Sequence, residues 1–183
     1  MILQNEKIIF IHPPRCSGTS IEHSMLKGKS VPDSEKHLNA KQIKNIVKDE
    51  WNSYFKFSII RNPWDRIISM YHSKYYALQG VGKYAGRSLK YFLNNFILPK
   101  WEHGLQCSDY VNLSIDFIIR FENRQQDIEK LNNKFNLFID GSIVTKKNKR
   151  HTDYKMYYDN ETIEIVNKKF NKDINQFNYK YDG

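Results

Sequence analysis

The stretch KIIFIHPPRCSGTSIEHSM, residues 7–25, decides the fold of this chain. Its apolar run KIIFI (residues 7–11) predicts a short buried strand, which Pro13 and Pro14 end. The small-residue loop CSGTS (residues 16–20) then leads into a helical pattern. A strand, a turn of small residues and a helix in this order expose backbone N–H groups at a helix N-terminus. Such an arrangement binds phosphate or sulfate groups, so the stretch predicts an anion-binding loop.

Strands and helices alternate along the rest of the chain. After the first loop, residues 30–40 are predicted as a polar loop, and residues 55–60 and 116–120 as strands. The predicted helices are residues 41–48, 88–98, 125–135 and 161–170. Asp159 or Asn160 is expected to cap the last of these helices. This alternation predicts an α/β fold of three layers, in which helices flank a central parallel sheet. The length of 183 residues predicts a single domain over residues 1–183.

The composition excludes several classes of protein. With 40% hydrophobic and 14% aromatic residues the chain can build a core, which excludes a disordered protein. No apolar run is long enough for a membrane span, and the N-terminus lacks the features of a signal peptide. Two cysteines, Cys16 and Cys107, make no disulfide framework and suit a reducing cytoplasm. The net charge of +9 indicates an anionic partner: a nucleic acid, a nucleotide, an acidic glycan or a membrane surface.

Two common kinds of phosphate loop do not match residues 12–20. A Walker A loop would need Gly in place of Pro13 and Lys in place of Thr19, so an ordinary ATPase or GTPase is disfavoured. A cysteine-based phosphatase would need an Arg six residues after Cys16, where the chain has Glu22.

A loop that binds a phosphosulfate group does fit. Arg15 adds a fixed positive charge inside the turn, and Thr19 and Ser20 add hydroxyl donors at the first helical turn. The alternative without a ligand is an ordinary Ser or Thr N-cap of the helix.

A second motif follows the next strand, where residues 57–60 run directly into RNPWDRIISMY, residues 61–71. Arg61 falls at the carboxyl end of that strand, which is the edge at which open α/β sheets bind ligands. Its guanidinium and the hydroxyl of Ser69, on the following helix, could hold one phosphate group. Two anion sites on adjacent strand ends imply a ligand that is phosphorylated at two places.

The helix of this second motif also has a structural explanation. Pro63 suits its first turn, and Asp65 and Arg66 could form a local ion pair instead of contacting a ligand. The residues predicted to point inward are Ile67, Ile68, Tyr71 and Tyr75.

These motifs resemble a known family. FIHPPRCSGTS (residues 10–20) resembles the FIHIPKTGGTS loop of sulfotransferases that use 3′-phosphoadenosine 5′-phosphosulfate (PAPS). FSIIRNPWDRIISMYH (residues 57–72) resembles their second motif, RNPxxRxxSxY. Two later blocks, residues 117–131 and 150–179, are also similar, so the resemblance covers residues 7–181. The branch that it resembles most is that of the carbohydrate sulfotransferases, which includes the heparan sulfate 2-O-sulfotransferases and many short bacterial proteins.

The resemblance implies a P-loop-like fold and PAPS as the donor of a sulfuryl group. It assigns the 3′-phosphate to Arg61 and Ser69 and, through a basic loop before the C-terminal helices, to Lys147 and Arg150. The sequence requires no metal, because it has no Walker pair that would bind Mg²⁺. The first-loop residues that the resemblance assigns to donor binding are Pro14, Arg15, Cys16, Ser17, Gly18, Thr19 and Ser20.

The first loop departs from the family pattern at three positions. Arg15 replaces Lys; it can stabilise the charge that develops on the bridging oxygen, which gives it a catalytic role, but it cannot give up a proton there. Cys16 replaces Thr, and Ser17 replaces Gly, which puts a Cβ where close approach of the backbone is wanted. Reduced turnover, or a chain that binds the nucleotide without turnover, is therefore an open alternative.

His37 is the predicted general base, because an alcohol acceptor must lose a proton and histidine titrates near neutrality. The segment SEKHLNAKQI (residues 34–43) resembles the position of the catalytic histidine in the carbohydrate branch. His12 is expected to pack or to orient another residue, and His72 to pack or cap. The remaining candidates are the carboxylates Glu22 and Glu122 and, without a special context, His23, His103 and His151.

The sequence thus predicts a sulfotransferase that carries the sulfuryl group of PAPS to an acceptor hydroxyl, which the resemblance implies to be that of a carbohydrate. A cytoplasmic enzyme of bacterial or viral origin is expected, without a nucleic-acid partner; its oligomeric state is open. The alternatives are a kinase-like phosphotransferase with a P-loop, and a non-catalytic basic module that binds nucleotides or nucleic acid.

Overall fold

A computed structural model describes residues 1–29, 31–78, 80, 82–95, 106–143 and 153–182. The chain divides into two compact units. One unit comprises Met1–Arg61 and Asp109–Lys146, and the other comprises Asn62–Ser108 and Lys147–Gly183. The single domain over residues 1–183 stays a prediction.

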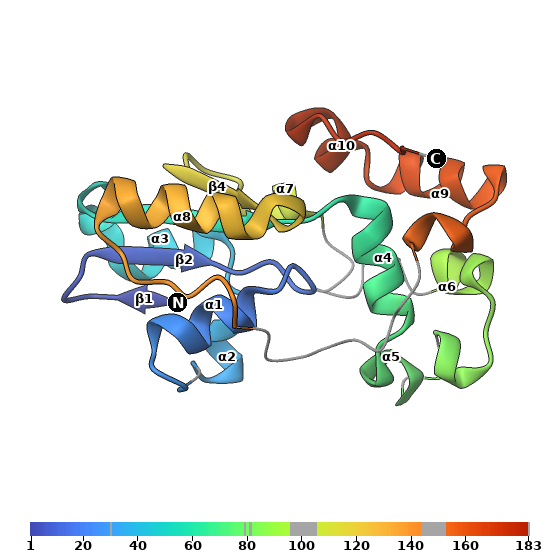
Figure 1. Ribbon diagram of the computed structural model, residues 1–183, viewed down its shortest axis with the longest axis horizontal. Helices are drawn as coiled ribbons and strands as arrows, with labels where there is room; N and C mark the ends of the chain where they lie inside the picture. Colours follow the sequence, from blue (N-terminus) through green and yellow to red (C-terminus); the bar gives the residue numbers. More distant parts are fainter. Residues whose placement is uncertain (30, 79, 81, 96–105, 144–152, 183) are drawn as a thin grey trace. The chain divides into compact units, whose positions relative to one another are not determined.

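The first unit is built on a four-stranded sheet with the strand order β1-β2-β3-β4 (Figure 1). The strands are β1 (Ile2–Leu3), β2 (Ile8–Ile11), β3 (Phe55–Ile60) and β4 (Phe117–Arg120). β2, β3 and β4 are parallel, with Phe10 opposite Phe57 and Phe57 opposite Phe117, whereas β1 runs antiparallel to β2. Every residue of β2 is buried, as expected for a central strand whose two faces are both covered.

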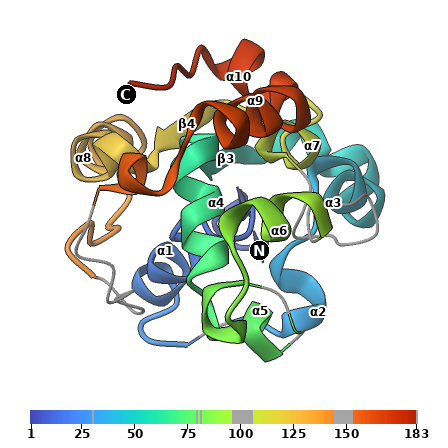
Figure 2. The ribbon, with the colours of Figure 1, turned by 90° about the vertical axis from the view of Figure 1, so that its right-hand side faces the viewer.

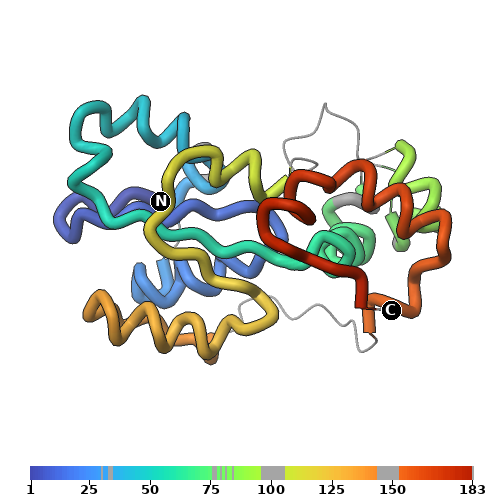
Figure 3. Tube along the Cα trace, turned by 90° about the horizontal axis from the view of Figure 1, so that it is seen from above, coloured from blue at the N-terminus to red at the C-terminus, as the bar shows by residue number. Residues whose placement is uncertain are grey.

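Helices cover both faces of this sheet. In Figures 1 and 3, α3 lies on one face, and α1 and α8 lie on the other. The helices of this unit are α1 (Gly18–Met25), α2 (Asp33–Lys36), α3 (Ala40–Val47) and α8 (Arg124–Phe135), with the 3-10 turns Lys48–Ser53 and Phe121–Asn123. The predicted three-layer α/β fold is therefore confirmed, with a sheet that is parallel except at β1. The strand β1 and the short helix α2, inside the predicted polar loop, were not expected from the sequence.

The second unit is helical in its described residues (Figure 2). Its helices are α4 (Pro63–Tyr71), α5 (Lys74–Leu78), α6 (Leu89–Asn95), α9 (Asn160–Lys169) and α10 (Asn171–Phe177), with the 3-10 turns Lys83–Ala85 and Tyr154–Tyr157. The short helix α7 (Cys107–Tyr110) begins in this unit and ends in the first, because the division falls between Ser108 and Asp109. Pro63 is the first residue of α4, as predicted, and Asn62 caps that helix by accepting hydrogen bonds from the N–H groups of Trp64 and Asp65. α9 packs against α4, α6 and α10.

Tyr75 does not point inward as expected. Tyr71 is buried, but α4 ends there, with His72 as its C-cap, and Tyr75 lies on α5 with 48% of its surface exposed. The helical periodicity that placed Tyr75 on the same face as Tyr71 does not continue beyond the end of α4.

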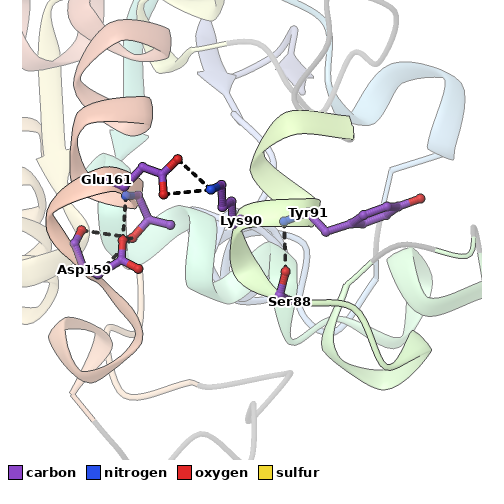
Figure 4. Close-up of polar contacts among 6 residues, drawn as sticks. Ser88, Lys90, Tyr91, Asp159 and Glu161 are labelled. Carbon is purple, nitrogen blue, oxygen red and sulfur yellow. Dashed lines mark hydrogen bonds and ion pairs between the residues drawn. The ribbon is translucent and has the colours of Figure 1, made fainter.

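Polar side-chain contacts order the described helices of the second unit. Figure 4 shows Lys90 of α6 paired with Glu161 of α9, with Nζ 2.7 Å from Oε1. Asp159 caps α9, as predicted, because its carboxylate accepts the N–H of Thr162 at 2.8 Å. Asp173, which has no solvent exposure, accepts the backbone N–H groups that begin α7. No helix in the described part of the chain has the length and the apolar character that crossing a bilayer demands.

Candidate active site

The loop between β2 and α1 has an unusual backbone. Arg15 and Ser17 adopt left-handed conformations, with φ values of 67° and 70°. Non-glycine residues rarely adopt this conformation, and held strain of this kind concentrates at functional sites. The φ value of Ser17 also explains why a Gly is favoured at this position in the family loop, since glycine reaches positive φ without a steric cost.

Ser17 occupies the N-cap position of α1, but its hydroxyl makes no capping bond to the helix. Instead, the Ser17 Oγ accepts a hydrogen bond from Nη1 of Arg124 at 3.2 Å. The alternative of an ordinary Ser N-cap is therefore wrong. Because the capping side chain is turned away, the N-terminus of α1 is suited to receive an anionic group.

Arg124 is a residue of this site that the sequence did not single out. It is the first residue of α8, and its Nη2 donates to the carbonyl oxygen of Gly141 and, at 2.6 Å, to that of Ile143. Burial lowers the pKa of its guanidinium, which nevertheless stays positively charged. Arg124 thus adds a cation to the loop and ties Ser17 to the segment that follows α8. Arg124 lies in the stretch of residues 117–131 that resembles the family, but nothing in the sequence shows that it contacts Ser17.

Arg61 lies where the sequence predicted, at the carboxyl end of β3 and beside the first loop. It is only 8% exposed, and its Nη1 donates to the carbonyl oxygen of Arg15 at 3.0 Å. The guanidinium also stacks over the ring of Phe121, with 3.9 Å between its carbon and the ring centroid. The chain segments that follow β2, β3 and β4 therefore converge at Arg61.

His37 lies next to the same loop. It follows α2, is half-buried, and its Nδ1 lies 2.8 Å from the carbonyl oxygen of His12. The two imidazole rings meet edge to face, with centroids 4.7 Å apart. The predicted general base and the predicted anion loop are thus neighbours within the first unit.

Glu22, another candidate for the general base, is buried beside His12. Its side chain has no solvent exposure, and its Oε1 lies 3.0 Å from Nδ1 of His12. An acceptor hydroxyl cannot reach a carboxylate that is fully covered, so Glu22 does not abstract the proton directly. The expectation that His12 packs or orients another residue agrees with its 3% exposure.

The ring of the same histidine, His12, requires residue 18 to be glycine. A Cβ added at Gly18 would lie 2.0 Å from Cδ2 of His12. Real atoms do not approach so closely, so the start of α1 can pass the His12 ring only because residue 18 is glycine. This close approach brings the helix N-terminus and the ring into direct contact.

The remaining predicted site residues lie in the first loop and the start of α1, on α4, or outside the described residues. Pro14 and Cys16 are buried in the loop, with the Cys16 Sγ 3.6 Å from the Pro14 carbonyl oxygen, and both cysteines of the chain are buried free thiols. Ser20 is buried on α1, its N–H bonded to the Ser17 carbonyl oxygen at 3.1 Å, whereas Thr19 is half-buried. Ser69 is buried on α4 of the second unit. Lys147 and Arg150, like His103 and His151, lie outside the described residues.

His72 has the packing and capping role that was expected. It is the C-cap of α4, and its N–H donates to the carbonyl oxygen of Ile68 at 3.0 Å. Its ring meets that of Tyr157 edge to face at 4.9 Å.

Comparison with known proteins identifies the family of the chain. A model of the sulfotransferase family matches residues 1–109, which is more than half of the 183 residues. The matched stretch contains the first loop, His37 and Arg61. No curated protein and no solved structure matches the chain. The chain therefore belongs to the sulfotransferase family, and it is a PAPS-dependent enzyme.

Proposed function

We propose that this enzyme transfers the sulfuryl group of PAPS to a hydroxyl group of a carbohydrate, as a member of the carbohydrate sulfotransferase branch. The observation that carries the proposal is the position of His37, 2.8 Å from the backbone of the anion loop that begins at His12. A candidate base thus adjoins a candidate donor site. We also propose that residues 1–183 work as one sulfotransferase domain.

The residues of the first unit fit the anionic part of the donor. The helix N-terminus without a side-chain cap and the left-handed turns at Arg15 and Ser17 support the binding of an anion by backbone N–H groups of this loop. We assign the phosphosulfate to the residues of this loop, which are Pro14, Arg15, Cys16, Ser17, Gly18, Thr19 and Ser20. We assign the 3′-phosphate to Arg61 and, from the motifs alone, to Ser69, Lys147 and Arg150.

The donor supplies an activated sulfuryl group. His37 receives the proton of the acceptor hydroxyl as the acceptor oxygen bonds to sulfur and the bond from sulfur to the bridging oxygen breaks. Arg15 stabilises the negative charge that develops on that bridging oxygen. Because these residues act by position and charge, we expect transfer without an added metal ion.

The acidic glycans that sulfation produces suit the net charge of +9, and this supports the carbohydrate as acceptor. We place the enzyme in the cytoplasm, in line with the two free thiols of Cys16 and Cys107.

Thermal unfolding with adenosine 3′,5′-bisphosphate tests the donor site. At 100 times its Kd the bisphosphate should add about 2.7 kcal/mol to the free energy of unfolding, whereas ATP and AMP should add much less. Stabilisation by ATP with Mg²⁺ alone would favour a kinase-like phosphotransferase. Tight, steeply salt-dependent binding of any duplex, without a response to the bisphosphate, would favour the nucleic-acid module.

A further inference from the structure

A fully buried carboxylate lies beside the proposed site and has no direct role in it. Glu22 of α1 is 0% exposed and bonds to Nδ1 of His12, which is 3% exposed. Its second oxygen, Oε2, lies 3.9 Å from Nζ of Lys36. Burying a carboxylate is costly unless it is paired, so its place in the fold needs an explanation. Since neither side chain is open to an acceptor, any contribution must pass through a neighbouring residue.

The Glu22–His12 pair consists of a carboxylate and a neutral imidazole. Burial lowers the pKa of His12, and the hydrogen bond with Glu22 only partly offsets this effect. Burial alone would raise the pKa of Glu22, but the hydrogen bond from His12 and the charge of Lys36 bring it below its usual value. Since Nδ1 of His12 lies 3.0 Å from a carboxylate oxygen, which can only accept a hydrogen bond, the Nδ1–H of His12 donates to Glu22. This bond fixes both the tautomer and the orientation of the His12 ring.

The oriented His12 ring touches both parts of the proposed site. On one side it lies against Gly18, where no Cβ would fit. On another side it meets the ring of His37, with centroids 4.7 Å apart and planes at 66°. It also stacks with Phe10, at 5.8 Å between centroids, which anchors it to the strand β2. The His12 ring therefore lies between Gly18, at the N-terminus of α1, and the ring of His37, the candidate base. It sets the distance between these two residues.

The backbone of His12 acts on His37 as well. Nδ1 of His37 lies 2.8 Å from the His12 carbonyl oxygen. A carbonyl oxygen can only accept a hydrogen bond, so neutral His37 carries its proton on Nδ1. The lone pair then lies on Nε2, and this is the nitrogen that can receive a proton from an acceptor hydroxyl.

We infer that Glu22 and His12 are positioning residues. Glu22 holds the His12 imidazole in one orientation, and that ring, together with the His12 carbonyl, fixes the tautomer of His37 and its place relative to Gly18. The inference rests on the proposed function, because it takes His37 to be the general base.

The test compares Glu22→Gln with Glu50→Gln, a matched change in an exposed pair, where Glu50 contacts Lys7. The measurements are kcat, the Kd of adenosine 3′,5′-bisphosphate, and the ¹⁵N spectrum of the His37 ring above its titration. Glu22→Gln should lower kcat by about 10- to 100-fold and leave the Kd within about threefold, because the base is displaced while the donor loop remains. Its His37 spectrum should show mixed tautomers, whereas the wild type and Glu50→Gln show protonation on Nδ1. If Glu22→Gln does not fold, the same measurements are made on Glu22→Asp. Its shorter side chain keeps the charge but places the carboxylate farther from His12.

Three results decide against the inference. An unchanged kcat in Glu22→Gln, or a wild-type His37 protonated on Nε2, overturns it and leaves the proposed function standing. A parallel loss of kcat and of bisphosphate affinity also overturns it, because Glu22 would then support the whole loop. Absence of sulfuryl transfer in the wild type overturns the proposed function instead, and the His37 spectra still decide whether Glu22 fixes its tautomer.

Discussion

Nη1 of Arg61 donates a hydrogen bond to the carbonyl oxygen of Arg15 at 3.0 Å. The residue that follows β3 therefore supports the loop that follows β2. A guanidinium carries several N–H donors in a planar fork, so one side chain can hold a loop and bind a phosphate. This makes Arg61 the most informative residue of the proposed donor site.

Arg61→Ala should abolish the thermal stabilisation by adenosine 3′,5′-bisphosphate, because it removes both the proposed phosphate ligand and the bond to Arg15. Arg61→Lys keeps the charge but loses the planar fork, so a reduced stabilisation is expected. Thermal unfolding with and without the bisphosphate measures both variants. A full shift in Arg61→Ala would remove Arg61 from the donor site.

Ser17→Gly should be more stable than Ser17→Ala by about 1 kcal/mol. Both changes remove the hydroxyl that Arg124 contacts, so the comparison isolates the backbone. Only glycine adopts the φ of 70° at this position without a steric penalty. Urea unfolding of the two variants gives the difference, and equal free energies of unfolding would show that the loop relaxes without strain.

His37→Ala should lower kcat by about 10²- to 10⁴-fold, the range typical for the loss of a general base. Stabilisation by adenosine 3′,5′-bisphosphate should remain, because the donor loop is intact. His23→Ala, on α1, is the matched control and should keep the wild-type rate. Wild-type turnover in His37→Ala would exclude His37 as the base.

The free energy of unfolding should fall as the pH drops below about 6.5, in part because of His12. The pKa of His12 is lower in the folded chain than its ordinary value of 6.5. Between these two values the unfolded chain binds more protons, so stability decreases with falling pH, and the contribution is complete only above 6.5. His12→Asn should flatten this part of the profile, as measured by urea unfolding at a series of pH values. Parallel profiles would contradict a neutral, buried His12.

Asp173→Asn should destabilise the chain by about 2 kcal/mol. Both carboxylate oxygens of Asp173 accept backbone N–H groups, those of Cys107 and Ser108, at 2.7 Å each. An asparagine would turn an NH₂ group toward one of these donors in a site without solvent exposure. The exposed Glu164→Gln serves as the control and should change stability by less than about 0.5 kcal/mol. Equal stability of the two variants in urea would show that the helix α7 does not depend on this cap.

Local patterns in the sequence predicted much of the fold and part of the site. The three parallel strands, and the loop after the first of them, are each one continuous stretch of sequence. In such a stretch an apolar run predicts a strand, and a run of small residues predicts a loop. Arg61 could be placed for the same reason, because it directly follows β3. The end of α4 at Tyr71 was missed, since the apolar spacing continues to Tyr75 although the helix does not.

The contacts that complete the site could not be predicted, because they join distant parts of the chain. Arg124 and Ser17 are 107 residues apart, and His37 and His12 are 25 residues apart. Glu22 looked like a possible base in the sequence, and only its burial against His12 shows that it is covered. A single sequence shows which residues can ionise; the fold decides which of them reach a substrate.

The two arginine contacts to the first loop have a consequence for the kinetics of donor binding. Arg61 holds Arg15 and Arg124 holds Ser17, so the conformational entropy of the loop is lost when the chain folds. A preorganised loop does not have to be ordered by its ligand, and association is then governed by diffusion and by the attraction of opposite charges. Loosening either arginine would leave the loop to be ordered by the donor, and this would slow the capture of the donor.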